Sequence, residues 1–196
     1  MATGVDRRSV LKRAACLGLA LPLLDVSVLH TIVSGEPDPT TTRPQAGDQL
    51  VLAAGGGKRD AVTPAVVPLG GPPRIAYPMD PTTKTVRDGS RLNQVLLVRL
   101  DSGDLAEETR ARAAAGIVAY SAVCTHTGCD VWDWDTRTRT LKCPCHFSVF
   151  DVKDAARILD GPATRRLPAL PLEIAGGVLV AAGGFVGRPG FEQGGA

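Results

Sequence analysis

Two short boxes in the middle of the sequence hold most of the residues that could do metal or redox chemistry. They are Cys124-Thr125-His126-Thr127-Gly128-Cys129 and Cys143-Pro144-Cys145-His146-Phe147-Ser148, with four of the five cysteines and two of the three histidines. In each box a cysteine precedes a histidine by two or three positions, so each offers one thiolate and one imidazole to a single metal centre. Cys129 and Cys145 remain, one in each box, as a natural disulfide pair.

Three kinds of site could use these side chains. Two structural disulfides would employ the four cysteines but leave both histidines without a role. A tetrahedral zinc site could take two cysteines and two histidines, although zinc ligands are usually paired as C-x-x-C and H-x-x-x-H. A [2Fe–2S] cluster with two cysteines on one iron and two histidines on the other uses four of these side chains. Because it leaves the remaining cysteine pair for a disulfide, it accounts for all six, and we take it as the prediction.

The boxes resemble those of the Rieske iron–sulfur proteins, whose high-potential branch carries C-T-H-x-G-C, then C-P-C-H, and an extra disulfide. The resemblance covers roughly residues 94–180. It implies one [2Fe–2S] cluster, with thiolates on one iron and imidazoles on the other, held by Cys124, Cys143, His126 and His146. It also implies that a Cys129–Cys145 disulfide ties the two cluster loops together. Gly161-Pro162-Ala163 resembles the proline-containing loop that covers the cluster in this family.

Within this family the closer resemblance is to the small subunit of arsenite oxidase, through Ile117 to Ser121 and Cys143 to Asp151. Rieske proteins of quinol–cytochrome c reductases have Gly after the last His, Tyr three residues further on, and usually Leu in the first box. Here those positions hold Phe147, Phe150 and Thr127. Ser148 matches the family serine that donates a hydrogen bond to a bridging sulfide. Phe150 lacks the tyrosine hydroxyl that would bond a ligand sulfur, which predicts a lower reduction potential.

The resemblance implies an electron-transfer subunit of a periplasmic oxidoreductase, with no independent substrate site evident on this chain. Its partners would be a larger molybdopterin subunit and, as acceptor, a cytochrome c or a copper protein. The alternative is the Rieske subunit of a quinol–cytochrome c reductase, with cytochrome b as partner. A Rieske oxygenase needs a second iron on two histidines and a carboxylate. Apart from the box histidines the sequence has only His30, in the predicted leader, so this chain alone cannot carry that site.

The elements that position the boxes are predicted to be strands, because 22 Gly and 15 Pro in 196 residues indicate a turn-rich, all-β protein. The resemblance specifies a Rieske-type antiparallel β-sandwich of stacked small sheets, with a cluster-binding subdomain formed by two loops at about residues 122–163. Prolines between Pro64 and Pro81 favour edge strands and loops, and the segment from Asp104 to Ala115 predicts a helix or an exposed loop. Strands are expected at 50–52, 66–67, 94–100, 117–123, 140–142, 148–152, 170–174 and 178–181.

The N-terminus predicts export. Arg7-Arg8-Ser9-Val10-Leu11-Lys12 and the apolar run that follows resemble a twin-arginine signal, which implies a periplasmic protein; the run could instead remain as a membrane anchor. The chain has 22 basic and 20 acidic residues. Removal of the leader would take away four basic and two acidic residues, so the net charge of the remainder would be near zero. This charge gives no sign of a nucleic-acid partner. We expect a leader or anchor at residues 1–35 and a Pro- and Thr-rich linker at residues 36–48. The Rieske domain is expected at residues 49–187, and a flexible tail at residues 188–196.

Overall fold

The computed structural model describes residues 38–53 and 59–191. The chain divides into two compact units, Met1–Glu36 and Pro37–Ala196, and all described residues belong to the second. The predicted leader and the last five residues of the predicted tail lie outside the described residues. Within the described ranges, no helix is long and apolar enough to cross a membrane.

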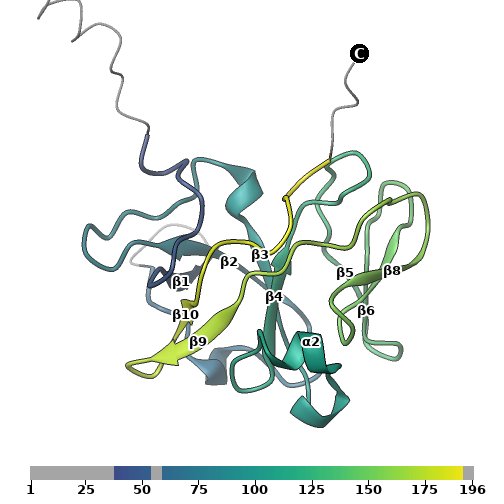
Figure 1. Ribbon diagram of the computed structural model, residues 1–196, viewed down its shortest axis with the longest axis horizontal. Coiled ribbons are helices and arrows are strands. Elements are labelled where there is room, and N and C mark those ends of the chain that lie inside the picture. The colour runs from purple at the N-terminus through teal and green to yellow at the C-terminus, as the bar shows by residue number, and fades with distance from the viewer. Residues whose placement is uncertain (1–37, 54–58, 192–196) are drawn as a thin grey trace, which may run out of the picture. The chain divides into compact units, whose positions relative to one another are not determined.

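The described part of the second unit is built on two antiparallel sheets (Figure 1). The larger contains β1 (Gln49–Leu52), β2 (Arg74–Met79), β3 (Val95–Arg99), β4 (Ile117–Ser121), β9 (Leu172–Ala175) and β10 (Val178–Ala181), in the order β4-β3-β2-β1-β10-β9. The smaller contains β5 (Asp133–Asp135), β6 (Thr140–Lys142), β7 (Val149–Asp151) and β8 (Arg157–Asp160), in chain order. The helices are short: η1 (Pro64–Val66), η2 (Arg91–Asn93), η3 (Ser102–Asp104) and α2 (Glu107–Arg110). The described part of the chain is therefore all-β, as predicted.

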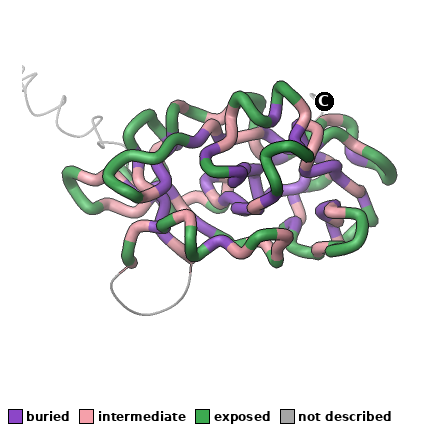
Figure 2. Tube along the Cα trace, turned by 90° about the horizontal axis from the view of Figure 1, so that it is seen from below, coloured by how far each residue is buried: buried purple, intermediate pink, exposed green. Residues whose placement is uncertain are grey.

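Strands β3 and β4 form a wall between two apolar cores, which explains why both read as unbroken apolar runs. Successive side chains of a strand point to opposite faces of the sheet. Leu96 and Val98 belong to a first core, which also contains Leu141 and Phe150 of the small sheet. Leu97 points to the opposite face and belongs to a second core, which packs against the large sheet. The buried residues accordingly run through the interior of the domain (Figure 2). This shared wall joins the two sheets.

One local expectation differs from the structure, and another is made more specific by it. The apolar pair Val66-Val67 was expected in a strand, but Val66 ends the short helix η1 and Val67 caps it. The segment from Asp104 to Ala115 was expected as a helix or an exposed loop, and it contains one short helical turn, α2. After α2, Ala114 pairs with Ile117 at the start of β4, and this turn places Ala115 and Gly116 in the left-handed region.

The prolines did not confine β2 to the edge of the sheet. It lies between β3 and β1, and Pro78 pairs with Leu50. The pairs between β2 and β3 end at Ala76, two residues before Pro78. Beyond that point the Pro78 carbonyl accepts a hydrogen bond from the Arg87 N–H (2.8 Å), so no ladder bond requires the N–H that proline lacks.

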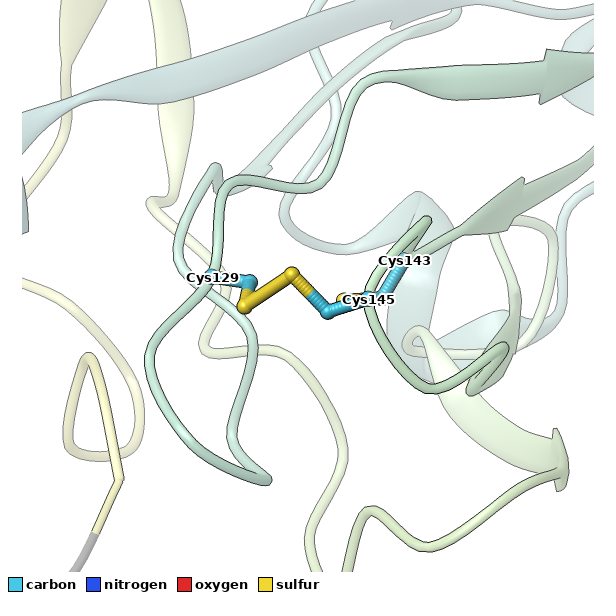
Figure 3. Close-up of side chains that lie close together, drawn as sticks. All are labelled: Cys129, Cys143 and Cys145. Atoms are coloured by element: carbon cyan, nitrogen blue, oxygen red, sulfur yellow. A yellow bond between two sulfur atoms is a disulfide. The ribbon is translucent and has the colours of Figure 1, made fainter.

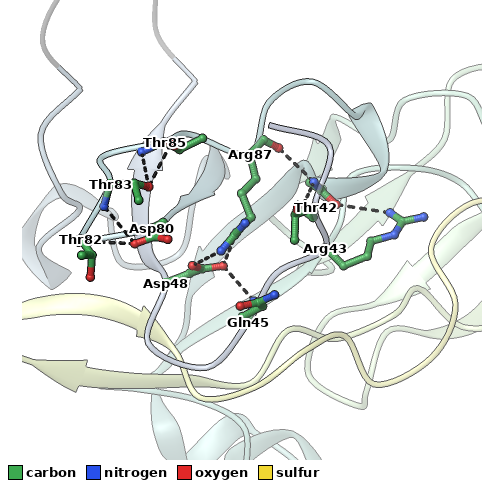
Figure 4. Close-up of polar contacts among 10 residues, drawn as sticks. Thr42, Arg43, Gln45, Asp48, Asp80, Thr82, Thr83, Thr85 and Arg87 are labelled. Carbon is green, nitrogen blue, oxygen red and sulfur yellow. Dashed lines mark hydrogen bonds and ion pairs between the residues drawn. The ribbon is translucent and has the colours of Figure 1, made fainter. Parts of the chain in front are cut away.

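The segment predicted as a linker is held against the domain over its last residues. Asp48 forms a bidentate ion pair with Arg87 at 2.7 and 2.9 Å, and both side chains are buried (Figure 4). The Gly47 N–H donates to the Ala181 carbonyl of β10 (2.9 Å). The Asn93 amide donates to the Thr42 carbonyl (2.8 Å). Residues 42–48 are therefore part of the packed domain.

Candidate metal centre

The two boxes fold into loops with the same backbone hydrogen bonds. We call residues 124–129 loop 1 and residues 143–148 loop 2. In loop 1 the Cys124 N–H donates to the Cys129 carbonyl (2.8 Å) and the Gly128 N–H donates to the Cys124 carbonyl (3.1 Å). Loop 2 repeats both bonds at 2.9 Å, from Cys143 to Ser148 and from Phe147 to Cys143. Each loop therefore starts with a cysteine fixed at the same backbone position.

The fifth residue of each loop has a left-handed backbone. Gly128 has φ +81° and Phe147 has φ +63°. Glycine adopts this conformation freely, whereas an L-residue with a side chain pays roughly 1–2 kcal/mol for it. The Phe147 side chain is 60% exposed, and Lys142 Nζ lies 4.7 Å from its ring centroid. Loop 2 therefore holds a strained, exposed aromatic ring directly after His146.

The four predicted ligands are arranged as two buried thiols and two facing imidazoles. Cys124 and Cys143 are the free cysteines of the described residues, and both are buried. The rings of His126 and His146 lie 4.7 Å apart between centroids, nearly perpendicular to each other. His126 Nδ1 is buried and has no hydrogen-bond partner among the described residues. Because a buried polar atom without a partner is costly, this nitrogen is suited to ligating a metal.

Electrostatics also favour a metal at the thiols. Burial, together with the neighbouring Cys143, raises the pKa of the Cys124 thiol to about 11. A thiolate in that environment is stable when a metal cation compensates its charge. The donor set therefore fits the [2Fe–2S] cluster predicted from the sequence.

A disulfide joins the two loops. Cys129 and Cys145 are bonded, with their Cα atoms 6.5 Å apart (Figure 3), which is the predicted pairing. The Cys143 sulfur lies within 4.8 Å of both bonded sulfurs. Bonded sulfurs are not thiolates, so these three cysteines do not form a separate metal site. The disulfide instead fixes the separation of loop 1 from loop 2.

The segment Gly161–Ala163 packs directly on loop 2. A Cβ at Gly161, whose φ is +87°, would lie 2.5 Å from Ser148 Cα and 2.7 Å from Ser148 N. The Ala163 N–H donates to Ser148 Oγ (3.0 Å), and Ser148 is fully buried. Because this oxygen accepts from Ala163, its own hydroxyl hydrogen remains available for donation. Pro162, between the two contact residues, is exposed.

Apolar packing surrounds the sulfur side of the site. Phe150 is fully buried in the first core, the same core that contains Cys124 and Cys143. Trp134 packs against that core, and its indole N–H donates to the Gly70 carbonyl (3.2 Å), which ties the small sheet to the loop that precedes β2. The thiols therefore lie in a dry, apolar setting, whereas His146 is exposed and His126 is half-buried.

A hydrogen bond that the sequence did not predict connects loop 1 to the segment around Arg165. Thr125 Oγ1 donates to the Arg165 carbonyl (2.6 Å). The Arg165 guanidinium donates in turn to the carbonyls of Arg188 and Gly190, at 3.1 and 2.9 Å. The position of Thr125 between two predicted ligands was the available sequence signal. Nothing in the local sequence marks Arg165.

The start of the predicted flexible tail also packs on loop 1. A Cβ at Gly128 would lie 2.8 Å from Phe191 Cδ1, and Gly128 is buried. Residues 188–191 are therefore held in place by the Arg165 bonds and by this contact. The fifth residue of loop 1, Gly128, is therefore covered, whereas the fifth residue of loop 2, Phe147, is exposed.

Comparisons with known proteins agree with this geometry. Residues 82–171 match the family model of the Rieske [2Fe-2S] domain. The chain is 48% identical over 77 residues to the Rieske subunit of a respiratory nitrate reductase from Haloferax mediterranei, which covers 39% of this chain and 34% of that protein. It is 37% identical over 105 residues to the cytochrome bc1 complex Rieske iron-sulfur subunit of Streptomyces lividans, which covers 51% and 62%. The chain thus spans between a third and two thirds of these relatives.

Among solved structures, the comparison found the soluble domain of Rieske protein II from Sulfolobus acidocaldarius. The match has 24% sequence identity and a TM-score of 0.36, and it covers 45% of this chain and 61% of that one.

Proposed function

Residues 82–171 form a Rieske [2Fe–2S] domain, and from that premise we propose that this protein is the electron-transfer subunit of a larger oxidoreductase complex. The observation that carries the proposal is the pairing of two buried free thiols with two facing imidazoles on loops of matched backbone geometry. When bound, the cluster supplies reversible one-electron chemistry, at a potential above that of all-cysteine clusters.

Each loop supplies one thiolate and one imidazole. Cys124 and Cys143, both buried, would hold one iron, and His126 and His146, which are less buried, would hold the other. The partnerless Nδ1 atom of His126 supports this assignment. Because His146 is exposed, it is the natural point of electron exit towards a partner.

The surrounding residues exclude water and tune the site. The segment Gly161–Ala163 closes over loop 2, and Ser148 has a hydroxyl hydrogen to donate towards the cluster. Phe150 adds apolar packing without a donor. Fewer hydrogen bonds to the sulfurs leave the added negative charge of the reduced state less stabilised, which lowers the potential.

The proposed complex is an arsenite oxidase-like oxidoreductase, in which a larger molybdopterin subunit performs the chemistry. This chain would pass electrons to a cytochrome c or a copper protein. Thr127 and Phe147, which lie exposed at the tips of the loops, support a partner other than quinol. The similarity to a nitrate reductase subunit supports a role within a multisubunit enzyme. The location would be the periplasm, through the leader around Arg7 and Arg8.

A second candidate is the Rieske subunit of a quinol–cytochrome c reductase, with cytochrome b as partner. It is favoured by the similarity to the cytochrome bc1 subunit of Streptomyces lividans. The two candidates differ in what co-purifies with the chain and in whether quinol reduces it directly.

The test begins with the purified full chain. It should contain two irons and two labile sulfides, and after reduction it should show the low-average-g paramagnetic resonance signal of mixed Cys/His ligation. Stoichiometric zinc without iron would refute the proposal. Tagged chain isolated from its own cells should then carry molybdenum for the first candidate or b-type haem for the second.

A further inference from the structure

Phe147 occupies a backbone position that its side chain disfavours. Its counterpart in loop 1 is Gly128, and both residues have a left-handed φ. Gly128 is buried beneath Phe191. The Phe147 side chain stays 60% exposed. Loop 2 therefore bears backbone strain that a glycine would avoid, and the ring gains little burial in return.

The contact with Lys142 does not account for the aromatic ring. Lys142 Nζ lies 4.7 Å from the ring centroid, and both side chains are at least partly exposed. Cation–π contacts at exposed sites are weak, and they do not offset the cost of a left-handed L-residue. Residues held in strained backbone conformations cluster at functional sites, and Phe147 is the one with an exposed aromatic ring next to a predicted ligand.

The position of Phe147 indicates what that role is. It directly follows His146, whose exposed ring faces the ring of His126. A protein that contacts Phe147 therefore approaches the imidazole side of the site and not the buried thiols. Exposed aromatic residues at the centre of an interface commonly act as anchors that insert into a pocket of the partner.

We propose that Phe147 is the docking anchor for a redox protein whose cofactor is exposed at one edge, within an apolar patch of its surface. The ring inserts into that patch, so the partner's cofactor is held close to His146. The strain of loop 2 is retained because the ring is needed for docking. This inference rests on the electron-transfer function proposed above and adds the contact surface and the chemistry of the partner.

The test compares cluster-loaded full-length protein with its Phe147→Gly and Phe147→Asn variants. Both replacements tolerate the left-handed backbone, so the loop is expected to fold in each. The reduced proteins are oxidised in stopped flow by cytochrome c, by the copper protein azurin and by ferricyanide. The control is Leu69→Ala, because Leu69 is 58% exposed and pairs at the Arg99 end of β3, opposite the end beside loop 1.

We expect the second-order rate with at least one protein acceptor to fall tenfold or more in both Phe147 variants. The ferricyanide rate and the reduction potential should change little, and the thermal midpoint of Phe147→Gly should rise. Wild-type rates with the protein acceptors test the proposed function, whereas the ratio of variant to wild type tests docking. Unchanged ratios with both acceptors would overturn the inference. So would a lower thermal midpoint of Phe147→Gly, because the ring would then serve stability.

Discussion

Replacing Gly161 with alanine tests whether the close contact of the Gly161–Ala163 segment with loop 2 holds the cover of the site in place. The new Cβ would lie 2.5 Å from Ser148 Cα and 2.7 Å from Ser148 N. Both are backbone atoms, so neither can move aside as the end of a flexible side chain would. The segment must lift, and the bond from the Ala163 N–H to Ser148 Oγ, now 3.0 Å, must weaken or break.

The expected loss of stability has two parts. The φ of Gly161 is +87°, and an alanine in the left-handed region costs roughly 1–2 kcal/mol. The lost hydrogen bond costs about 1 kcal/mol net. The sum is about 2–3 kcal/mol, which corresponds to a fall of roughly 4–12 °C in thermal midpoint for a domain of this size. Lifting the cover also exposes the site, so the cluster should be lost faster.

Gly177→Ala is the matched control. Gly177 has φ +81° and nothing within 4 Å of its Cβ position, so this variant has the backbone cost without the contact. Far-ultraviolet circular dichroism gives the thermal midpoint, and bleaching of the visible absorption gives the lifetime of the cluster. Gly161→Ala should have the lower midpoint and the shorter lifetime. If the two variants were equal in both measurements, the close contact would not be what holds the cover.

Three further changes have definite expected outcomes. The disulfide closes a loop with a sequence separation of 16, so replacing Cys129 and Cys145 with serine should cost about 3 kcal/mol in unfolding free energy; an unchanged denaturation midpoint would contradict this. Phe150→Tyr should raise the reduction potential by a few tens of millivolts in voltammetry at fixed pH, because the new hydroxyl can donate a hydrogen bond to a ligand sulfur; about 59 mV corresponds to a tenfold change in equilibrium constant for one electron. An intact cluster with an unchanged or lower potential would refute the alignment of Phe150 with the family tyrosine. Changing Arg7 and Arg8 to lysine should leave folded protein in the cytoplasm, and unchanged periplasmic delivery would show that the leader has another role.

The sequence predicted the parts of the site that depend on local order. The two boxes and the strands that lead into them follow from residue types and spacings within a few positions. Cys129 and Cys145, 16 positions apart, were predicted as a pair because they are the cysteines left over, one in each box. The last hairpin was equally readable, because Gly176 and Gly177 supply the two positive φ angles of a tight turn between β9 and β10.

Features set by contacts between distant residues were not predictable. Phe191 packs on Gly128, 63 positions earlier in the chain, and no periodicity in the tail marks that contact. The same is true of the ion pair between Asp48 and Arg87. A Pro- and Thr-rich composition indicates a linker, yet the Asp48 ion pair and the hydrogen bonds made by Gly47 and Thr42 hold its last residues against the domain.

The structure gives the two loops unequal roles although their backbones match. Loop 1 is packed at two points: Thr125 is bonded to the Arg165 carbonyl and Gly128 is covered by Phe191, although Thr127 between them is exposed. Loop 2 has cover on its inner side, through Ser148, but its outer tip at His146 and Phe147 is open. A partner protein can therefore approach His146 without displacing residues 188–191, whereas Phe191 of that segment covers Gly128 in loop 1. The asymmetry lies in what packs on each loop, and under the proposed function it leaves His146 as the more accessible of the two predicted histidine ligands.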